Sequence, residues 1–506
     1  MDEESGPRPR RAATLFLVAV WVLFAALYAG AARDERHIYF GGDQADLLSA
    51  ADETRAGHPP LVGARSREGL FHPGPLFVYG LAVVQAVASG REAWTISIVS
   101  LLQSTSVLVL SLLTLRLSRS LALAASLPYL FVFNYSFLIY LRFLWNVTIV
   151  FPALALAVWL VVSIETPRPW KLPALAAVLS LIAQAHLGFF FVAGWLGAVA
   201  FARSILPPRR FHRRDFALAA GVLGLAWSPV LWEAVRHRGG NLAKVVARFS
   251  APHERHPLSE VCGAIDSLLS ELMGGGPGTR LLLAASLVLL AAASLRRGEW
   301  ARKLRFLFMA LSGSWIVFLL SVRAIPEPIQ TYYLRPIWVI TASTLVGGAS
   351  ALVFLLHDER YRLAVGLAIA AVVVAVSVRP ALEMRRTFAS PGWNTFPLAE
   401  FRVVVGEIAA RVGPGEPRRA DVEFQLADLV GAEPSFVYLL RRQGVTCERS
   451  LGAPRFRVAK ASESPPESGW EQVLRTERYR LEADGISASA LLDGNFLSRQ
   501  APNGDF

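Results

Sequence analysis

Two carboxylates, Asp43 and Asp46, follow a Gly-Gly pair a few residues after the first long apolar run of the chain. They stand in the stretch HIYFGGDQADLLSAADETRAGHPPLV, residues 37–62. A carboxylate within reach of a hydroxyl can act as a general base, and paired carboxylates can bind a divalent cation such as Mg²⁺ or Mn²⁺. We expect Asp43 and Asp46 to be catalytic, with metal binding as a secondary role. Solvated loop acids are the simpler alternative.

Other polar side chains stand at the ends of later apolar runs. Ionisable residues at such positions are costly unless they are paired or in contact with water. Arginines there can instead reach lipid phosphates, histidines can be satisfied at the interface, and tyrosines can belong to an aromatic belt. Several such residues in one layer nevertheless favour a site. We expect the following to bind substrate: His72, Arg142, Asn146, His186, Arg323, Tyr332, Tyr333 and Arg335.

The elements that must position these residues are apolar helices. The 506-residue chain is 54% hydrophobic and only 18% charged, and apolar runs recur through its first 380 residues. This pattern is typical of a multi-pass membrane protein. The net charge of +12 does not indicate nucleic acid, because the basic residues cluster in short loops between apolar runs.

We expect eleven transmembrane helices in a domain that covers residues 1–380. The candidate spans are roughly 13–32, 94–115, 120–140, 146–164, 171–184, 187–202, 215–235, 280–295, 306–322, 336–356 and 363–379. The run over residues 73–90 is ambiguous, since it is short and follows a Pro-rich stretch. If it crossed the membrane, every later loop would change sides.

The distribution of basic residues decides between these two topologies. With 73–90 lying in the interface, the inner loops hold 19 Lys and Arg in 51 residues and the outer loops hold 14 in 125. The positive-inside rule therefore favours an amphipathic helix at 73–90 and a cytoplasmic N-terminus. The loops 33–93 and 236–279 and the tail then face outward from the cell membrane.

The tail, residues 381–506, has a different composition from the membrane domain. FRVVVGEIAARV predicts a helix, and SFVYLLRRQGVTCE with RFRVA suggests a small soluble α/β domain before a polar end. Both cysteines, Cys262 and Cys447, would lie on the oxidising side. A disulfide between them and two unpaired thiols are both open.

A family resemblance rests on the first loop and the spans that follow it. GGDQADLLSAADETRAGHPPLVGARSREGLFHPGPLFVY resembles the first outer loop of GT-C glycosyltransferases, in particular the aminoarabinose and protein O-mannosyl transferases. LWNVTIVFPALALAVWL, LIAQAHLGFFFVAGWL and, more loosely, QTYYLRPIW are also similar. Two positions depart from that pattern: Gln44 replaces a frequent acid, and His72 stands where relatives carry Lys.

The resemblance implies a polyprenyl-phosphate-linked sugar as donor and transfer on the extracytoplasmic face. It also implies an essential aspartate in the first loop, which by position is Asp43. The acceptor would be a cell-envelope glycan, a lipid or a protein, and membrane lipids would surround the enzyme. Two other functions stay open at this point: a transporter or flippase of lipid-linked glycans, and a non-catalytic membrane scaffold.

Overall fold

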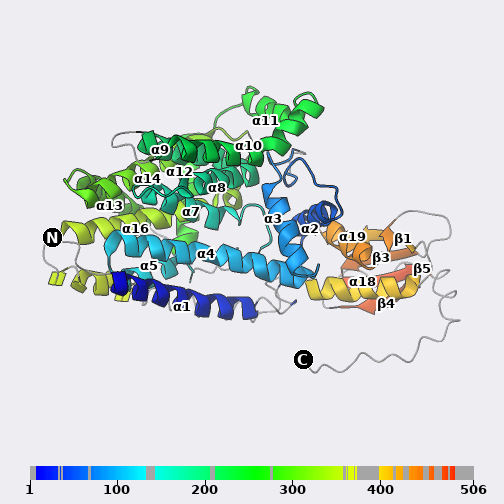
Figure 1. Ribbon diagram of the computed structural model, residues 1–506. Helices are drawn as coiled ribbons and strands as arrows, with labels where there is room; N and C mark the ends of the chain where they lie inside the picture. Colours follow the sequence, from blue (N-terminus) through cyan, green and yellow to red (C-terminus); the bar gives the residue numbers. More distant parts are fainter. Residues whose placement is uncertain are drawn as a thin grey trace. The chain divides into compact units, whose positions relative to one another are not determined.

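The computed structural model describes most of the chain. The described residues form many helices and one small sheet (Figure 1). The described residues are 7–31, 35, 38–66, 70–132, 143–205, 211–273, 277–326, 328–356, 360–361, 363–369, 371–372, 398–413, 418–425, 432–447, 455–460, 470–476 and 479–484. They form two compact units. The membrane unit comprises residues 1–33 and 50–393, and the C-terminal unit comprises residues 34–49 and 394–506.

The membrane unit is a bundle of apolar helices. Among the described residues, five helices or helical runs are long and apolar enough to cross a bilayer. These are α4 (Glu92–Ser118), η2 (Leu187–Phe189) continued by α9 (Phe190–Ile205), α10 (Arg213–Arg236), α14 (Glu299–Arg323) and α16 (Ile337–Leu355). Other helices of this unit are α1 (Pro7–Ala31), α5 (Leu121–Val132), α7 (Val150–Ser163), α8 (Lys171–Ala185) and α13 (Pro277–Ser294).

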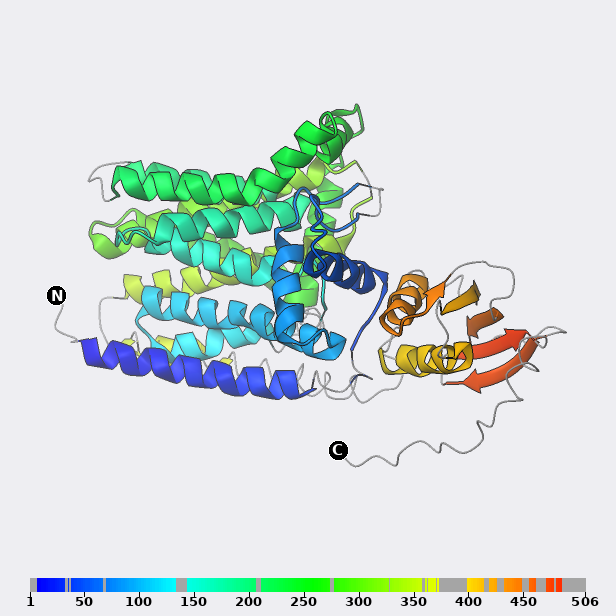
Figure 2. The ribbon, with the colours of Figure 1, turned by 45° about the vertical axis from the view of Figure 1, so that its right-hand side comes forward.

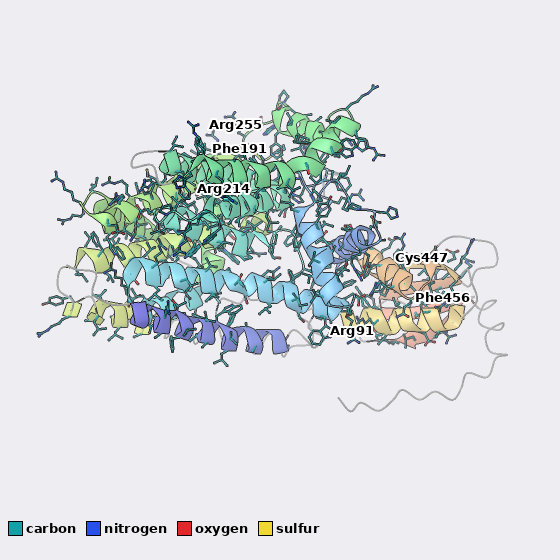
Figure 3. All side chains as sticks on the ribbon, viewed as in Figure 1. Arg91, Phe191, Arg214, Arg255, Cys447 and Phe456 are labelled. Carbon is teal, nitrogen blue, oxygen red and sulfur yellow. The ribbon has the colours of Figure 1, made fainter. Side chains whose placement is uncertain are left out.

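Burial separates the centre of this bundle from its surface. In the most apolar window of α16, 83% of the residues are buried, and α16 packs against α13, α4 and α14. In α10 the share is only 11%, and the exposed side chains include Leu225, Trp232 and Val235. Phe191 is similarly 58% exposed on α9 (Figure 3). Large apolar side chains exposed along whole helices indicate contact with lipid.

The helix α3 (Leu76–Val87) occupies the ambiguous run. Its 12 residues span about 18 Å, which is too short for a hydrocarbon core of about 30 Å. Figures 1 and 2 both show it running across the direction of α4. Its length and direction agree with the prediction that 73–90 lies in the interface.

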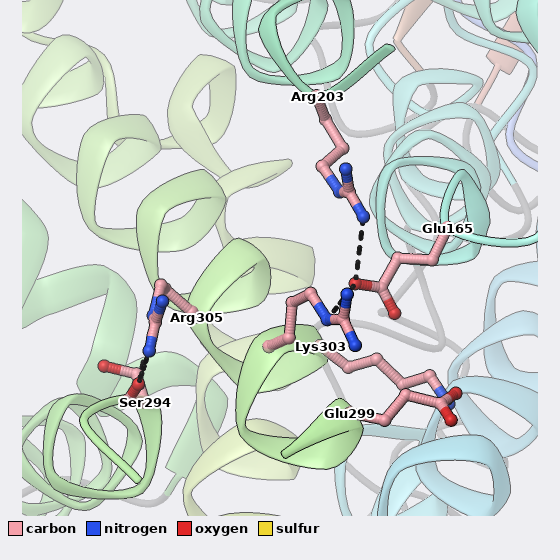
Figure 4. A network of polar contacts seen from close by, with 7 residues as sticks. Glu165, Arg203, Ser294, Glu299, Lys303 and Arg305 are labelled. Atoms are coloured by element: carbon pink, nitrogen blue, oxygen red, sulfur yellow. Dashed lines mark hydrogen bonds and ion pairs between the residues drawn. The ribbon is translucent and has the colours of Figure 1, made fainter. Parts of the chain in front are cut away.

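Charged side chains meet at one end of the bundle (Figure 4). The carboxylate of Glu165, just after α7, lies 3.6 Å from Arg203 on α9 and 3.9 Å from Arg302 on α14. These residues come from three of the loops that were predicted to be cytoplasmic, 165–171, 203–214 and 296–305. Their meeting agrees with the prediction that the three loops share one side. The number of eleven spans stays a prediction, because residues 133–142 and 373–397 lie outside the described part of the chain.

Three further helices lie in the membrane unit. They are α11 (Gly240–Ser250), α12 (Leu258–Met273) and α15 (Thr331–Leu334). Cys262 is exposed on α12, and it and Cys447 in β2 are free thiols. The disulfide considered from the sequence is therefore not formed in this structure.

The C-terminal unit contains a five-stranded mixed sheet of order β2-β1-β3-β5-β4. Its strands are β1 (Arg419–Gln425), β2 (Thr446–Cys447), β3 (Arg455–Lys460), β4 (Trp470–Arg475) and β5 (Tyr479–Asp484). β1 pairs in parallel with β2 and β3, whereas β5 pairs antiparallel with β3 and β4. The helices α18 (Leu398–Val412) and α19 (Ala432–Arg442) belong to the same unit.

The aromatic core of this unit joins helices to sheet. The ring of Phe401 on α18 lies 4.5 Å from Phe436 on α19 and 5.3 Å from Tyr479 on β5, centroid to centroid. All three side chains are fully buried. The sequence pattern of SFVYLLRRQGVTCE thus divides into a helix and a short strand. The predicted small α/β fold is what the described residues form.

Candidate functional site

Asp43 lies in the first turn of the helix α2 (Gly42–Arg55). The helix begins with a cap, because the side-chain Oε1 of Gln44 accepts a hydrogen bond of 2.8 Å from the N–H of Gly41. Asp43 and Asp46 are both exposed, whereas Gln44 is buried. An acidic residue in the first turn is favoured by the positive end of the helix dipole. The local sequence therefore holds Asp43 as an accessible carboxylate at a capped helix start.

Tyr39 is the neighbour of Asp43 that the sequence analysis missed. Burial, and next the negative charge of Asp43, raise the pKa of the Tyr39 phenol to about 12. The ring also lies beside Gly41, where an added Cβ would come within 3.1 Å of the Tyr39 hydroxyl. Tyr39 consequently stays protonated at neutral pH and is a hydrogen-bond donor near Asp43.

A second group of predicted residues meets within the membrane unit. The chain folds back at residues 63–72, where the N–H of His72 donates to the carbonyl of Ala64 and the N–H of Gly63 donates to the carbonyl of His72. This places the ring of His72 5.7 Å from the ring of His186, which follows α8. The sequence analysis named both histidines, and the fold brings them together.

Both histidines are neutral in this environment. Burial lowers the pKa of His72 to about 4, and burial together with the neighbouring His72 lowers the pKa of His186 to about 3. The Nδ1 atom of His186 accepts a hydrogen bond from the N–H of Gly188, so its proton resides on Nε2. At neutral pH the pair can donate and accept hydrogen bonds, but it does not supply positive charge.

Amide side chains fix the surroundings of the histidine pair. The Nε2 of Gln184 donates to the carbonyl of Ala226, and its Oε1 accepts from the N–H of Leu76 at 3.4 Å. Gln184 passes so close to Gly74 that a Cβ there would lie 2.1 Å from Oε1. Asn146 is buried and donates to the carbonyl of Ala185. Asn146 was predicted to bind substrate, and here it holds the turn before His186.

Asn241 is a further positioning residue that the sequence analysis missed. Its side chain pairs with both the N–H and the carbonyl of Phe71, next to His72. Its own N–H donates to the carboxylate of Glu233. The signal in the sequence is the Gly239–Gly240 turn, where both residues have positive φ and direct the chain back toward Glu233.

The predicted arginines differ in environment. The guanidinium of Arg335 lies 5.7 Å from the ring centre of Trp338, and burial lowers its pKa to about 10, so that it stays charged at neutral pH. Arg323 is the last residue of α14, and its carbonyl accepts from the N–H of His256. Arg142 lies outside the described residues. Tyr332 and Tyr333 lie in α15, where the structure describes the backbone alone.

The cation site predicted at Asp43 and Asp46 stays a prediction. Asp43 and Asp46 are three residues apart on one helix, and no group of three His, Cys, Asp or Glu suited to a metal occurs among the described residues. Mg²⁺ is commonly bound by one or two carboxylates together with substrate phosphates and water. Two exposed carboxylates are of the type that such a site uses, and the proposed reaction assigns no step to a metal.

The comparisons with known proteins bear on the fold. No protein-family model matches the chain, and no curated protein sequence matches it. Among solved structures it is similar to ArnT from Cupriavidus metallidurans bound to undecaprenyl phosphate, with a TM-score of 0.55 and 14% identity. The similarity covers 92% of this chain and 97% of that one. The chain therefore has a fold similar to that of ArnT over most of its length.

Proposed function

We propose that this protein is a membrane glycosyltransferase that moves a sugar from a polyprenyl-phosphate donor to an acceptor outside the cytoplasm. The observation that carries the proposal is the fold: nearly the whole chain is similar to ArnT, whose structure holds undecaprenyl phosphate. Asp43 at a capped helix start, directly after the first apolar helix, adds a base of the required chemistry. The acceptor is a cell-envelope glycan, a lipid or a protein.

In the proposed reaction the acceptor hydroxyl attacks C1 of the sugar. Its oxygen forms the new C1–O bond, the bond from C1 to the phosphate oxygen breaks, and polyprenyl phosphate leaves with the electron pair. The hydroxyl proton passes to the carboxylate of Asp43 and then to water. The sugar carries positive charge in the transition state, as in glycoside hydrolysis.

The leaving phosphate gains negative charge, so donors that face it lower the barrier. Arg335 is charged at neutral pH, and its guanidinium can donate two parallel hydrogen bonds to two phosphate oxygens. Arg323 is a second candidate for this role. His72 and His186 are neutral and contribute hydrogen bonds only. This division of roles predicts that replacing Arg335 weakens donor binding and transfer more than replacing either histidine does.

A transfer assay with isolated membranes tests the proposal. Membranes that contain the protein are incubated with polyprenyl phosphates carrying different radiolabelled sugars, and matched membranes without the protein are the control. We expect the label of one donor to move into an acceptor while free polyprenyl phosphate appears. Movement of intact donor across sealed vesicles, with no bond broken for any sugar, would instead indicate a flippase.

A further inference from the structure

The residues that lead to Asp43 belong to the C-terminal unit. Residues 34–49 are far from residues 394–506 in sequence, yet the two ranges form one compact unit. The first-loop acid is thus carried by the same unit as the small sheet. This arrangement raises the question of which contacts hold it there.

Backbone hydrogen bonds attach the segment just before Asp43. The N–H of Leu398, the first residue of α18, donates to the carbonyl of Ile38 at 3.2 Å. The hydroxyl of Ser435 on α19 donates to the carbonyl of Phe40 at 2.9 Å, and this bond is buried. An ion pair between Glu35 and Arg402 adds a further link. The segment is therefore held at three points along six residues.

Side-chain burial reinforces these bonds. Phe40 is fully buried, and its ring lies 5.9 Å from the ring of Tyr438, one turn beyond Ser435 on α19. Ile38, Leu47 and Leu48 are also buried. Removing Phe40 from this core would expose a large apolar surface, so the segment and α19 are expected to move as one body.

Ser435 stands in the first turn of α19, so no carbonyl of this helix lies four residues before it. The side chain is fully buried, and its hydroxyl donates to a carbonyl 395 residues earlier in the chain. Only two residues separate Phe40 from Asp43, and both are glycines, which fix no conformation by themselves. A bond at Phe40 therefore limits the positions open to Asp43.

We propose that Ser435 is a positioning residue for Asp43, and that the C-terminal unit is in this way a required part of the glycosyltransferase. The inference rests on the proposed function, in which Asp43 takes the acceptor proton. The hydroxyl of Ser435 fixes the Phe40 carbonyl, the cap between Gly41 and Gln44 continues this constraint, and Asp43 follows in the first helical turn. Ser435 touches no substrate itself.

The test compares Ser435→Ala with Thr476→Ala in the full-length protein. Thr476 lies in the same unit, and its hydroxyl bonds to Glu400 at 2.7 Å and to the N–H of Tyr479 at 3.0 Å rather than to the segment 34–49. Each variant loses one hydrogen-bonded hydroxyl. We expect Ser435→Ala to lower kcat for sugar transfer about ten-fold or more, since small misplacement of a catalytic group is costly, with an unchanged KM for the donor. Thr476→Ala keeps kcat.

Hydrogen exchange supplies a second readout. Ser435→Ala should speed amide exchange in residues 38–46, with the sheet strands unaffected. Arg402→Gln, whose side chain is 38% exposed and which releases Glu35, should produce a weaker change in the same direction without risk to folding. Equal kcat in Ser435→Ala and the wild type, or equal losses in the serine and threonine variants, would overturn the positioning role. Full activity of Asp43→Asn would instead overturn the proposed function.

Discussion

At the scale of single residues, environment decides the charge of each candidate. A solvent-exposed histidine is largely protonated at pH 6. Burial lowers the pKa of His72 to about 4 and that of His186 to about 3, so both are neutral at this pH. Arg335 is also desolvated, but its pKa of about 10 leaves it protonated. The proposed binding of the donor phosphate therefore depends on arginine, and the role proposed for the histidine pair is to provide hydrogen bonds.

The histidine pair predicts a loss of stability in acid. The unfolded chain takes up these protons near pH 6.5, whereas the folded protein resists them until about pH 4. The unfolded state then binds more protons, so the free energy of unfolding falls as pH drops through this window and is retained above it. Thermal unfolding in detergent, followed at several pH values, measures this effect.

Substitutions test whether the histidine pair causes this loss of stability in acid. His186→Asn should reduce the drop in melting temperature between pH 6.5 and 4, because it removes one buried proton acceptor. His58→Gln, at an exposed loop position, should leave the drop as it is in the wild type. An identical acid response in all three proteins would contradict the assignment.

At the scale of elements, the ends of α7, α9 and α14 depend on one carboxylate. Glu165 and Arg203 are about 4% and 5% exposed and lie 3.6 Å apart, so each is buried with its partner (Figure 4). Removing one partner of a buried pair leaves an uncompensated charge. We expect Glu165→Gln to lower the free energy of unfolding by about 3 kcal/mol.

A neighbouring pair supplies the control. Glu299 on α14 pairs with Lys303 at 2.7 Å, but the glutamate is 65% exposed. Glu299→Gln should cost about 0.5 kcal/mol or less, since an exposed pair is weakened by solvent. Similar losses for both variants in denaturation experiments would show that Glu165 is not buried with its arginines in the protein.

At the scale of the whole molecule, the proposed function requires the predicted outer loops 33–93 and 236–279 to lie outside the cytoplasm. Cys262 is exposed on α12 within the predicted outer loop 236–279. Cys447 is partly buried, and burial raises its pKa to about 11, so it reacts slowly with maleimides, which need the thiolate. An impermeant maleimide added to intact cells should therefore label the protein once, at Cys262.

An inner loop provides the comparison. In a Cys262→Ser background, Arg297→Cys should be labelled only after the membrane is permeabilised, because this exposed position just before α14 belongs to the predicted inner loop 296–305. Labelling of Arg297→Cys in intact cells, together with no labelling of Cys262 in the wild type, would reverse the proposed orientation.

Much of the architecture could be predicted because its signals are local. Long apolar runs mark α4, α10, α14 and α16, and the short helix α3 occupies the run for which the charge distribution predicts an interfacial position. The ends of the helices were harder to predict from the sequence. The span expected from residue 146 is helical from Val150, because residues 146–149 form turns and Asn146 is occupied with the carbonyl of Ala185. Such a contact has no periodic signature.

The remaining features depend on contacts between distant parts of the sequence. The sequence around Phe40 gives no indication that its ring packs against Tyr438. The first loop was therefore assigned wholly to the membrane domain, whereas residues 34–49 belong to the C-terminal unit. Likewise, His72 and His186 were predicted to bind substrate, and only the structure shows that they are buried side by side and neutral. The roles of the predicted site residues stay predictions until they are measured.

The central claim is that Asp43 removes the acceptor proton. Purified wild type, Asp43→Asn and Glu53→Gln, an exposed acid on the same helix, are compared for sugar transfer from the polyprenyl-phosphate donor. We predict that Asp43→Asn loses transfer by a factor of about a hundred or more while its unfolding is unchanged, and that Glu53→Gln stays active. Transfer by Asp43→Asn at the wild-type rate would contradict the account.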